Sequence, residues 1–149
     1  MERAPDKKPT ADIIIVDDAP ENLDILIEIL SDTPYTVRPA TNAESALKAA
    51  AVRPPDLVLA DIHLPGMNGF ALCEKLKRDV RLKDTPVIFI SGSTGADVVR
   101  YVYAAGGADY IVKPFQSEEV LSRVKNHLEL RLLRRELERY RAAFGVIDT

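Results

Sequence analysis

Five side chains that could do chemistry each follow a short apolar run of the sequence. They are Asp17 and Asp18 after residues 13–16, Asp61 after 57–60, Ser91 after 86–90, and Lys113 after 110–112. Each aspartate by itself is typical of a turn or a helix cap. As a set, however, they comprise three carboxylates, one hydroxyl and one ammonium group at the ends of successive runs. This combination can bind a hard cation and stabilise the charge of a phosphoryl group during its transfer.

The chemistry of these groups follows from their charges. Three neighbouring carboxylates repel one another and need a cation to coexist, and an all-oxygen ligand set suits Mg²⁺, with Mn²⁺ as a substitute. Asp61 is the candidate nucleophile, because a carboxylate forms an acyl phosphate directly. Lys113 and the cation would neutralise the transferring phosphoryl oxygens, and Ser91 could donate a hydrogen bond to them.

The elements that must position these residues alternate along the chain. Apolar runs predict strands at residues 13–16, 35–38, 57–60, 86–90 and 110–112, and amphipathic stretches predict helices at 20–30, 43–52, 70–78, 96–105 and from 117 onward. Asn42 and Ser117 are the expected helix caps. Continuous apolar strands indicate a parallel sheet covered on both faces, hence a three-layer α/β fold. Such sheets bind ligands at the carboxyl ends of their strands.

The composition fits one soluble domain. The chain has 149 residues, of which 46% are hydrophobic and 29% charged, and its formal net charge is −3. Its single cysteine, Cys73, excludes an internal disulfide and is expected to pack in the core. The sequence of residues 1–11 predicts a disordered leader, because it lacks the apolar core of a signal peptide. With no apolar stretch of roughly 20 residues, we expect no membrane association and a cytoplasmic location.

Four segments give the chain a resemblance to a known family. They are IIIVDDAPEN, DLVLADIHLPGMNGF, PVIFISGS and AGGADYIVKPF. Together they resemble the receiver domain of bacterial response regulators, the phosphoacceptor modules of two-component signalling. The resemblance covers residues 12–127. It implies the flavodoxin-like (βα)5 fold with strand order 2-1-3-4-5, and a histidine kinase or phosphotransfer protein as the phosphoryl donor.

The resemblance also implies roles for residues of the acidic site. Asp61 would be the phosphoacceptor. Asp18, Asp61 and the main-chain carbonyl of His63 would bind Mg²⁺ directly, while Asp17 would act mostly through water. The positions of His63 and Ser93 would tune the rate at which the acyl phosphate hydrolyses.

Further roles follow from the same resemblance on the other side of the site. Lys113 would bind the phosphoryl group, and its bond to Pro114 would be cis. Ser91 and Tyr110 would form a switch pair, because Ser91 would move towards the phosphoryl group and Tyr110 would rotate into the space it leaves. The surface formed by the fourth helix, the fifth strand and the fifth helix would carry the signal.

The last predicted helix continues beyond the receiver, over residues 128–149. Apolar residues recur there at spacings of three and four, namely Leu130, Leu133, Leu137, Tyr140, Phe144 and Ile147. This heptad pattern predicts a parallel coiled coil and a homodimer. Interleaved arginines and glutamates indicate the solvated flanks of a coil, so nucleic acid is not expected as a partner. The helix would lead to an output domain, such as a nucleotide cyclase, phosphodiesterase, phosphatase or histidine kinase, although a free-standing receiver with a dimerising tail also fits.

Three other readings explain the residues less well. An aspartate-nucleophile phosphatase of the haloacid dehalogenase type needs a D-x-D pair after its first strand, whereas this chain has adjacent Asp17 and Asp18 and places its candidate nucleophile after the third. A phosphorylation-independent binding module would usually lack an acidic residue or the lysine. A flavin-binding relative would need a first loop that accepts phosphate, and here that loop is acidic. We therefore expect no enzymatic activity beyond self-phosphorylation and autodephosphorylation.

Overall fold

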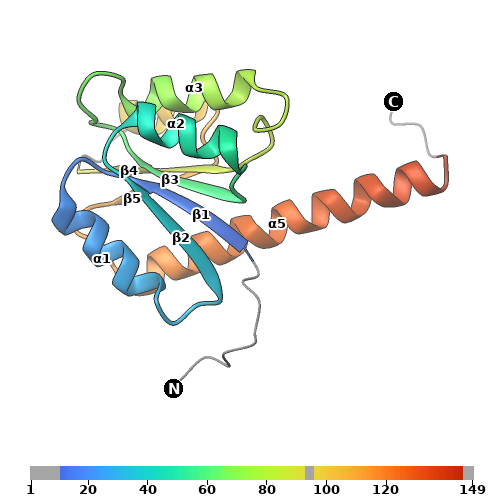
Figure 1. Ribbon diagram of the computed structural model, residues 1–149, viewed down its shortest axis with the longest axis horizontal. Helices are drawn as coiled ribbons and strands as arrows, with labels where there is room; N and C mark the ends of the chain where they lie inside the picture. Colours follow the sequence, from blue (N-terminus) through green and yellow to red (C-terminus); the bar gives the residue numbers. More distant parts are fainter. Residues whose placement is uncertain (1–10, 93–95, 146–149) are drawn as a thin grey trace.

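The computed structural model of the protein describes residues 11–92 and 96–145 and shows a five-stranded parallel sheet between two layers of helices (Figure 1). The strands are β1 (Ala11–Val16), β2 (Tyr35–Ala40), β3 (Leu57–Asp61), β4 (Val87–Ser91) and β5 (Asp109–Val112), in the order β2-β1-β3-β4-β5. The helices are α1 (Pro20–Leu30), α2 (Ala43–Val52), α3 (Gly69–Arg78), α4 (Ala96–Ala104) and α5 (Ser117–Ala143). The predicted flavodoxin-like topology is therefore confirmed.

The strands separate two apolar clusters because successive side chains of a strand point to opposite faces of the sheet. Residues such as Ile14, Val58 and Phe89 pack under α2, α3 and α4, and residues such as Ile13 and Leu59 pack under α1 and α5. Every residue of β3 and β4 is buried. This burial on both faces explains why β3 and β4 are almost entirely apolar, and it makes the centre of the sheet a rigid support for the residues at its carboxyl edge.

The loops and caps agree with the sequence in part. Asn42 caps α2 by accepting a hydrogen bond from the main-chain N–H of Ser45 at 2.8 Å. The expected cap at Ser117 is wrong, because Ser117 is already helical and the extended residue before it is Gln116, whose side chain makes no capping hydrogen bond. Cys73 is buried as predicted, and burial raises the pKa of its thiol to about 11.

α5 packs on the sheet only over its first part and then projects from the body of the molecule (Figure 1). Arg131, which is 9% exposed, is the last buried residue of this helix in the described chain. Its Nη1 donates to the main-chain carbonyl of Asp84 at 3.0 Å, and its Nε lies 3.7 Å from the carboxylate of Asp56. These contacts hold the helix against the edge of the sheet opposite the acidic residues.

Both ends of the chain reach beyond the described part. The expected leader lies outside it except for Ala11, which belongs to β1, and Ile147 of the heptad pattern also lies outside. Within the described residues, no helix has the length and apolar character needed to cross a membrane. The helical prediction for residues 128–143 is confirmed, whereas the coiled coil stays a prediction.

Candidate functional site

Three carboxylates meet where β1 and β3 end side by side. Asp17 and Asp18 follow β1, and Asp61 is the last residue of β3, the neighbour of β1 in the sheet. Each residue offers one oxygen, and these oxygens all lie within 4.8 Å of one another. Asp17 is completely buried and Asp61 is 4% exposed, whereas Asp18 faces solvent. The site is therefore a largely buried acidic cluster, called the acidic pocket below, that meets solvent at Asp18.

Lys113, which follows β5, reaches across the sheet edge into this pocket. Its Nζ lies 2.8 Å from Oδ2 of Asp61 and 3.3 Å from Oδ2 of Asp17. Burial alone would lower the pKa of Lys113, but the hydrogen bonds and charges of Asp61 and Asp17 raise it above its ordinary value. The lysine is thus held in its charged form. It compensates one of the three carboxylates and leaves the pocket with an excess of negative charge that suits a divalent cation.

Further hydrogen bonds orient the two buried carboxylates. Oδ1 of Asp17 accepts from the main-chain N–H of Ala19 at 3.0 Å, and Oδ2 accepts from the side-chain amide of Asn22 at 3.2 Å. Oδ1 of Asp61 accepts from the main-chain N–H of His63 at 2.9 Å. Sequence reasoning missed Asn22, whose only signal is its place in the first turn of the helix after the acidic pair. For His63, the structure shows its N–H on Asp61, and metal binding by its carbonyl stays a prediction.

The loop after Asp61 approaches the start of α3 so closely that only glycine fits at position 69. The N–H of Gly69 donates to the carbonyl of Ile62 at 2.9 Å. A Cβ on Gly69 would collide with the main-chain carbonyl oxygen of Asp61 and would lie 3.0 Å from Cα of Ile62. Both obstacles are backbone atoms of the segment that carries the candidate nucleophile, so neither can move without moving Asp61.

Gly69→Ala is therefore expected to destabilise the protein and displace Asp61. We expect a loss of about 2–4 kcal/mol in the free energy of unfolding, because the added methyl group must push backbone apart. Urea denaturation measures this loss. Gly92→Ala is the matched control, since a Cβ there meets nothing within 4 Å. Equal stabilities of the two variants would contradict the close approach at Gly69.

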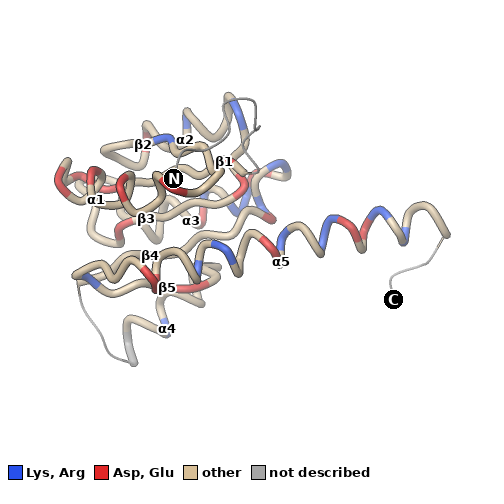
Figure 2. The backbone as a smooth tube through the Cα atoms, turned by 90° about the horizontal axis from the view of Figure 1, so that it is seen from below, with Lys and Arg blue, Asp and Glu red and all other residues tan. Residues whose placement is uncertain are grey.

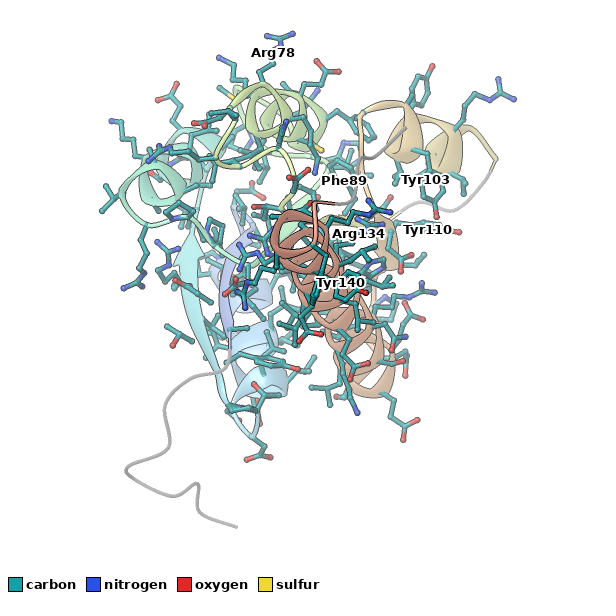
Figure 3. All side chains as sticks on the ribbon, turned by 90° about the vertical axis from the view of Figure 1, so that its right-hand side faces the viewer. Arg78, Phe89, Tyr103, Tyr110, Arg134 and Tyr140 are labelled. Atoms are coloured by element: carbon teal, nitrogen blue, oxygen red, sulfur yellow. The ribbon has the colours of Figure 1, made fainter. Side chains whose placement is uncertain are left out.

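The two predicted switch residues lie on neighbouring strands. Ser91 is fully buried at the end of β4, and its main-chain carbonyl accepts from the N–H of Lys113 at 2.8 Å. Tyr110 is half-buried on β5, opposite Phe89 in the strand register. Figure 3 shows Tyr110 on the same side of the molecule as Tyr103 of α4. Ser91 therefore shares the sheet edge with Lys113, and Tyr110 flanks α4.

Two other predictions concern the surroundings of the pocket. The bond between Lys113 and Pro114 is cis, as the resemblance implied. Ser93, expected to tune hydrolysis, lies outside the described residues. Asn68 caps α3 by accepting from the N–H of Ala71 at 2.9 Å, so the turn before Gly69 is well formed.

A charged cluster that sequence reasoning missed joins β5 to α5. The carboxylate of Asp109 accepts two hydrogen bonds from Nη1 of Arg123, at 2.7 and 2.8 Å, and lies 3.0 Å from Nε2 of His127. Burial alone would raise the pKa of Asp109, but the hydrogen bonds from Arg123 and His127 hold it below its ordinary value. The arginine and the histidine stand one helical turn apart on α5, which is the only signal the sequence offers.

Arg123→Met is expected to lower stability at pH 7 by about 1 kcal/mol, a modest loss because solvent screens the half-exposed arginine. A carboxylate with a lowered folded-state pKa stabilises the fold above its unfolded value of about 3.9, and this contribution disappears as the pH falls through the folded-state pKa. The difference between variant and wild type should therefore shrink below about pH 4. Urea denaturation at pH 7 and pH 3 measures it, with the exposed Arg139→Met as control.

The sheet order, the acidic pocket and the lysine that reaches into it define a receiver-type α/β fold, and comparisons with known proteins agree. The model of the response regulator receiver domain matches residues 13–125. The chain therefore belongs to the response regulator receiver domain family.

Individual relatives place this domain within longer proteins. Response regulator PleD of Caulobacter vibrioides is 34% identical over 91% of this chain but only 30% of its own length. Transcriptional regulatory protein BaeR of Escherichia coli is 32% identical over 99% of this chain and 60% of its own length. A crystal structure of NtrX from Brucella abortus, 34% identical, covers 92% of this chain and 30% of its own, with a TM-score of 0.83. The chain thus spans about a third of the length of PleD and NtrX.

Proposed function

We propose that this chain is a signalling switch that accepts a phosphoryl group on Asp61 from a histidine kinase or a phosphotransfer protein. The observation that carries the proposal is the ammonium group of Lys113 between the carboxylates of Asp61 and Asp17, at 2.8 and 3.3 Å. A lysine drawn into a buried acidic pocket provides a positive charge where phosphoryl oxygens would arrive.

The donor set of the pocket fits Mg²⁺, with Mn²⁺ as a substitute, because its oxygens come from three neighbouring carboxylates. Asp17, Asp18 and Asp61 would hold the ion together with the main-chain carbonyl of His63. When bound, the ion would supply positive charge against the phosphoryl oxygens and the carboxylates.

Asp61 would perform the transfer with one carboxylate oxygen. This oxygen forms a bond to the phosphorus as the bond from phosphorus to the donor's histidine nitrogen breaks, and the imidazole keeps the electron pair of that bond. Lys113 stays protonated and neutralises the transferred group, and Ser91 donates a hydrogen bond to it. The raised pKa of Lys113 supports this role, because a charged ammonium group is needed at the pH of the cell.

The signal would leave through Ser91 and Tyr110 to the surface of α4, β5 and α5. The adjacency of Tyr110 and α4 in the fold supports this route. α5 would form a homodimer and lead to an output domain, while the receiver itself would catalyse nothing beyond its own phosphorylation and dephosphorylation. Relatives named a probable cyclic di-GMP phosphodiesterase and a DNA-binding response regulator indicate how varied such outputs are. We expect the chain to act in the cytoplasm.

The test is the intact mass of the chain after incubation with acetyl phosphate, with and without Mg²⁺. We expect a single phosphoryl adduct that forms only when Mg²⁺ is present. An unmodified chain, under conditions in which a control receiver is modified, would contradict the proposal and favour a phosphorylation-independent binding module.

A further inference from the structure

The projecting part of α5 presents its apolar residues on the face opposite to the one that packs on the sheet. Val120 and Val124 are fully buried against the sheet, whereas Leu133 is 60% exposed. Leu133 lies nine positions after Val124, which is two and a half turns at 3.6 residues per turn, so the two side chains point to opposite faces of the helix. The exposed face consists of Leu130, Leu133, Leu137, Tyr140 and Phe144, called the seam below.

Packing within the receiver does not explain the seam. Its members are 46–70% exposed, and they recur at spacings of three and four. Apolar residues that follow this repeat on a projecting helix pack into a second helix with the same repeat. A second copy of this chain presents such a helix.

The charges beside the seam select the direction of the partner. With Leu130 and Leu137 at the first core position of each heptad, Glu129 and Glu136 lie on one flank of the seam, and the flank across it carries Arg134 and Arg141. In a parallel pair, the residue before one core position faces the residue five places later on the other helix. Glu129 then meets the partner's Arg134. An antiparallel pair would instead bring glutamate to glutamate and arginine to arginine.

We propose that two copies of this chain associate through the seam as a parallel, in-register coiled coil. Ion pairs between the helices, Glu129 with Arg134 and Glu136 with Arg141, stabilise this arrangement. This inference deepens the homodimer of the proposed function, because it names the residues that set orientation and register. Figure 2 shows the basic and acidic segments that alternate along the projecting part of α5.

The attachment of α5 to its own receiver is compatible with this pairing. Arg131 binds the carbonyl of Asp84 and, with Arg135, lies near the carboxylate of Asp56. Leu137 lies six residues beyond Arg131, which at 100° per residue turns it well away from this anchored side. In the dimer the two receivers therefore lie on the outer sides of the coil and leave the seam free for the partner helix.

A charge-exchanged variant tests the orientation. It carries Glu129→Arg, Arg134→Glu, Glu136→Arg and Arg141→Glu, so its composition and net charge equal those of the wild type. In a parallel coil, the wild-type homodimer and the variant homodimer both have attractive flanking pairs. Every flanking pair of a mixed dimer of wild type and variant is repulsive. This lowers the association constant of mixed dimers by about tenfold, because several weak surface ion pairs turn from attractive to repulsive at once. In an antiparallel coil the mixed dimer has only attractive pairs and dominates.

Native mass spectrometry of an equimolar mixture, with one chain isotopically labelled, distinguishes these outcomes. Sorting into two homodimers supports the proposal, and a majority of mixed dimers overturns it. Circular dichroism confirms that the variant is folded. The same experiment at matched concentration with Glu138→Arg and Arg139→Glu, a charge exchange outside these flanks, should give the statistical share of mixed dimers.

Leu137→Lys tests the seam itself and should shift the chain to monomer in analytical ultracentrifugation. The control is Leu132→Lys, which changes an exposed leucine outside the seam and should leave the dimer unchanged. A wild type that stays monomeric at the highest soluble concentration, with and without acetyl phosphate, also overturns the proposal. The phosphoryl adduct on Leu137→Lys, measured by intact mass, tests the phosphoacceptor role separately from the coiled coil. If this variant is monomeric and still forms the normal adduct, the phosphoacceptor role does not depend on the coiled coil.

Discussion

Asp61→Asn is expected to abolish the phosphoryl adduct that the wild type forms with acetyl phosphate and Mg²⁺. The amide has nearly the shape of the carboxylate, and its oxygen can still accept the hydrogen bond from His63 that the structure shows at 2.9 Å. The neutral amide lacks the negatively charged oxygen that must attack phosphorus, and its nitrogen is a poor nucleophile because the lone pair is delocalised into the carbonyl group. The expected loss is therefore chemical and not structural. Intact mass measures it directly.

Stability separates this loss from misfolding. The substitution removes one of three neighbouring carboxylates, so we expect the melting temperature without Mg²⁺ to stay the same or to rise. Asp18→Asn is the matched control, because Asp18 is the exposed carboxylate of the set. This control keeps the nucleophile, and it should form the adduct at a higher Mg²⁺ concentration than the wild type. An adduct of full yield on Asp61→Asn would move the acceptor to another residue, with Asp18 the first to examine by peptide mapping.

Lys113→Ala is expected to slow phosphorylation by about 100-fold or more, the usual result of removing a group that stabilises charge developing in a transition state. It should also lower the free energy of unfolding by about 2 kcal/mol at pH 7 without Mg²⁺. The reason is burial: Asp17 is fully buried, and the lysine lies 3.3 Å from it. A buried carboxylate without a neighbouring positive charge raises the free energy of the folded state. Because Mg²⁺ would replace part of the missing charge, it should stabilise the variant more than the wild type.

The time course of adduct formation and urea denaturation with and without Mg²⁺ measure these two effects. Lys125→Ala is the matched control, since Lys125 is an exposed lysine on α5 that lines the same surface pocket as Ala11 and Tyr35, at the starts of β1 and β2 and away from their carboxyl ends. It should change neither quantity. If Lys113→Ala were phosphorylated as fast as the wild type, the ammonium group would serve only to stabilise the fold.

The sequence by itself determined which residues would stand at the functional edge. Asp17, Asp61, Ser91 and Lys113 each end an apolar run, and parallel strands joined by right-handed crossovers must bring such ends to one edge. Local periodicity also placed the helices within a residue or two of their bounds, for example Pro20–Leu30 and Ala43–Val52. These predictions succeed because they depend on the burial pattern of one segment at a time.

The tertiary structure alone decided how those residues touch. The contact of Lys113 with Asp61 spans 52 positions of the chain, and nothing local to either residue fixes its length. The need for glycine at position 69 comes from the main-chain carbonyl of Asp61, which lies eight residues earlier at the end of β3. Helix capping at Ser117 was predicted wrongly because the chain enters α5 one residue earlier, after the turn that follows β5. Periodicity is a property of a segment and can be read from it, whereas distances across a sheet edge depend on how all the segments pack.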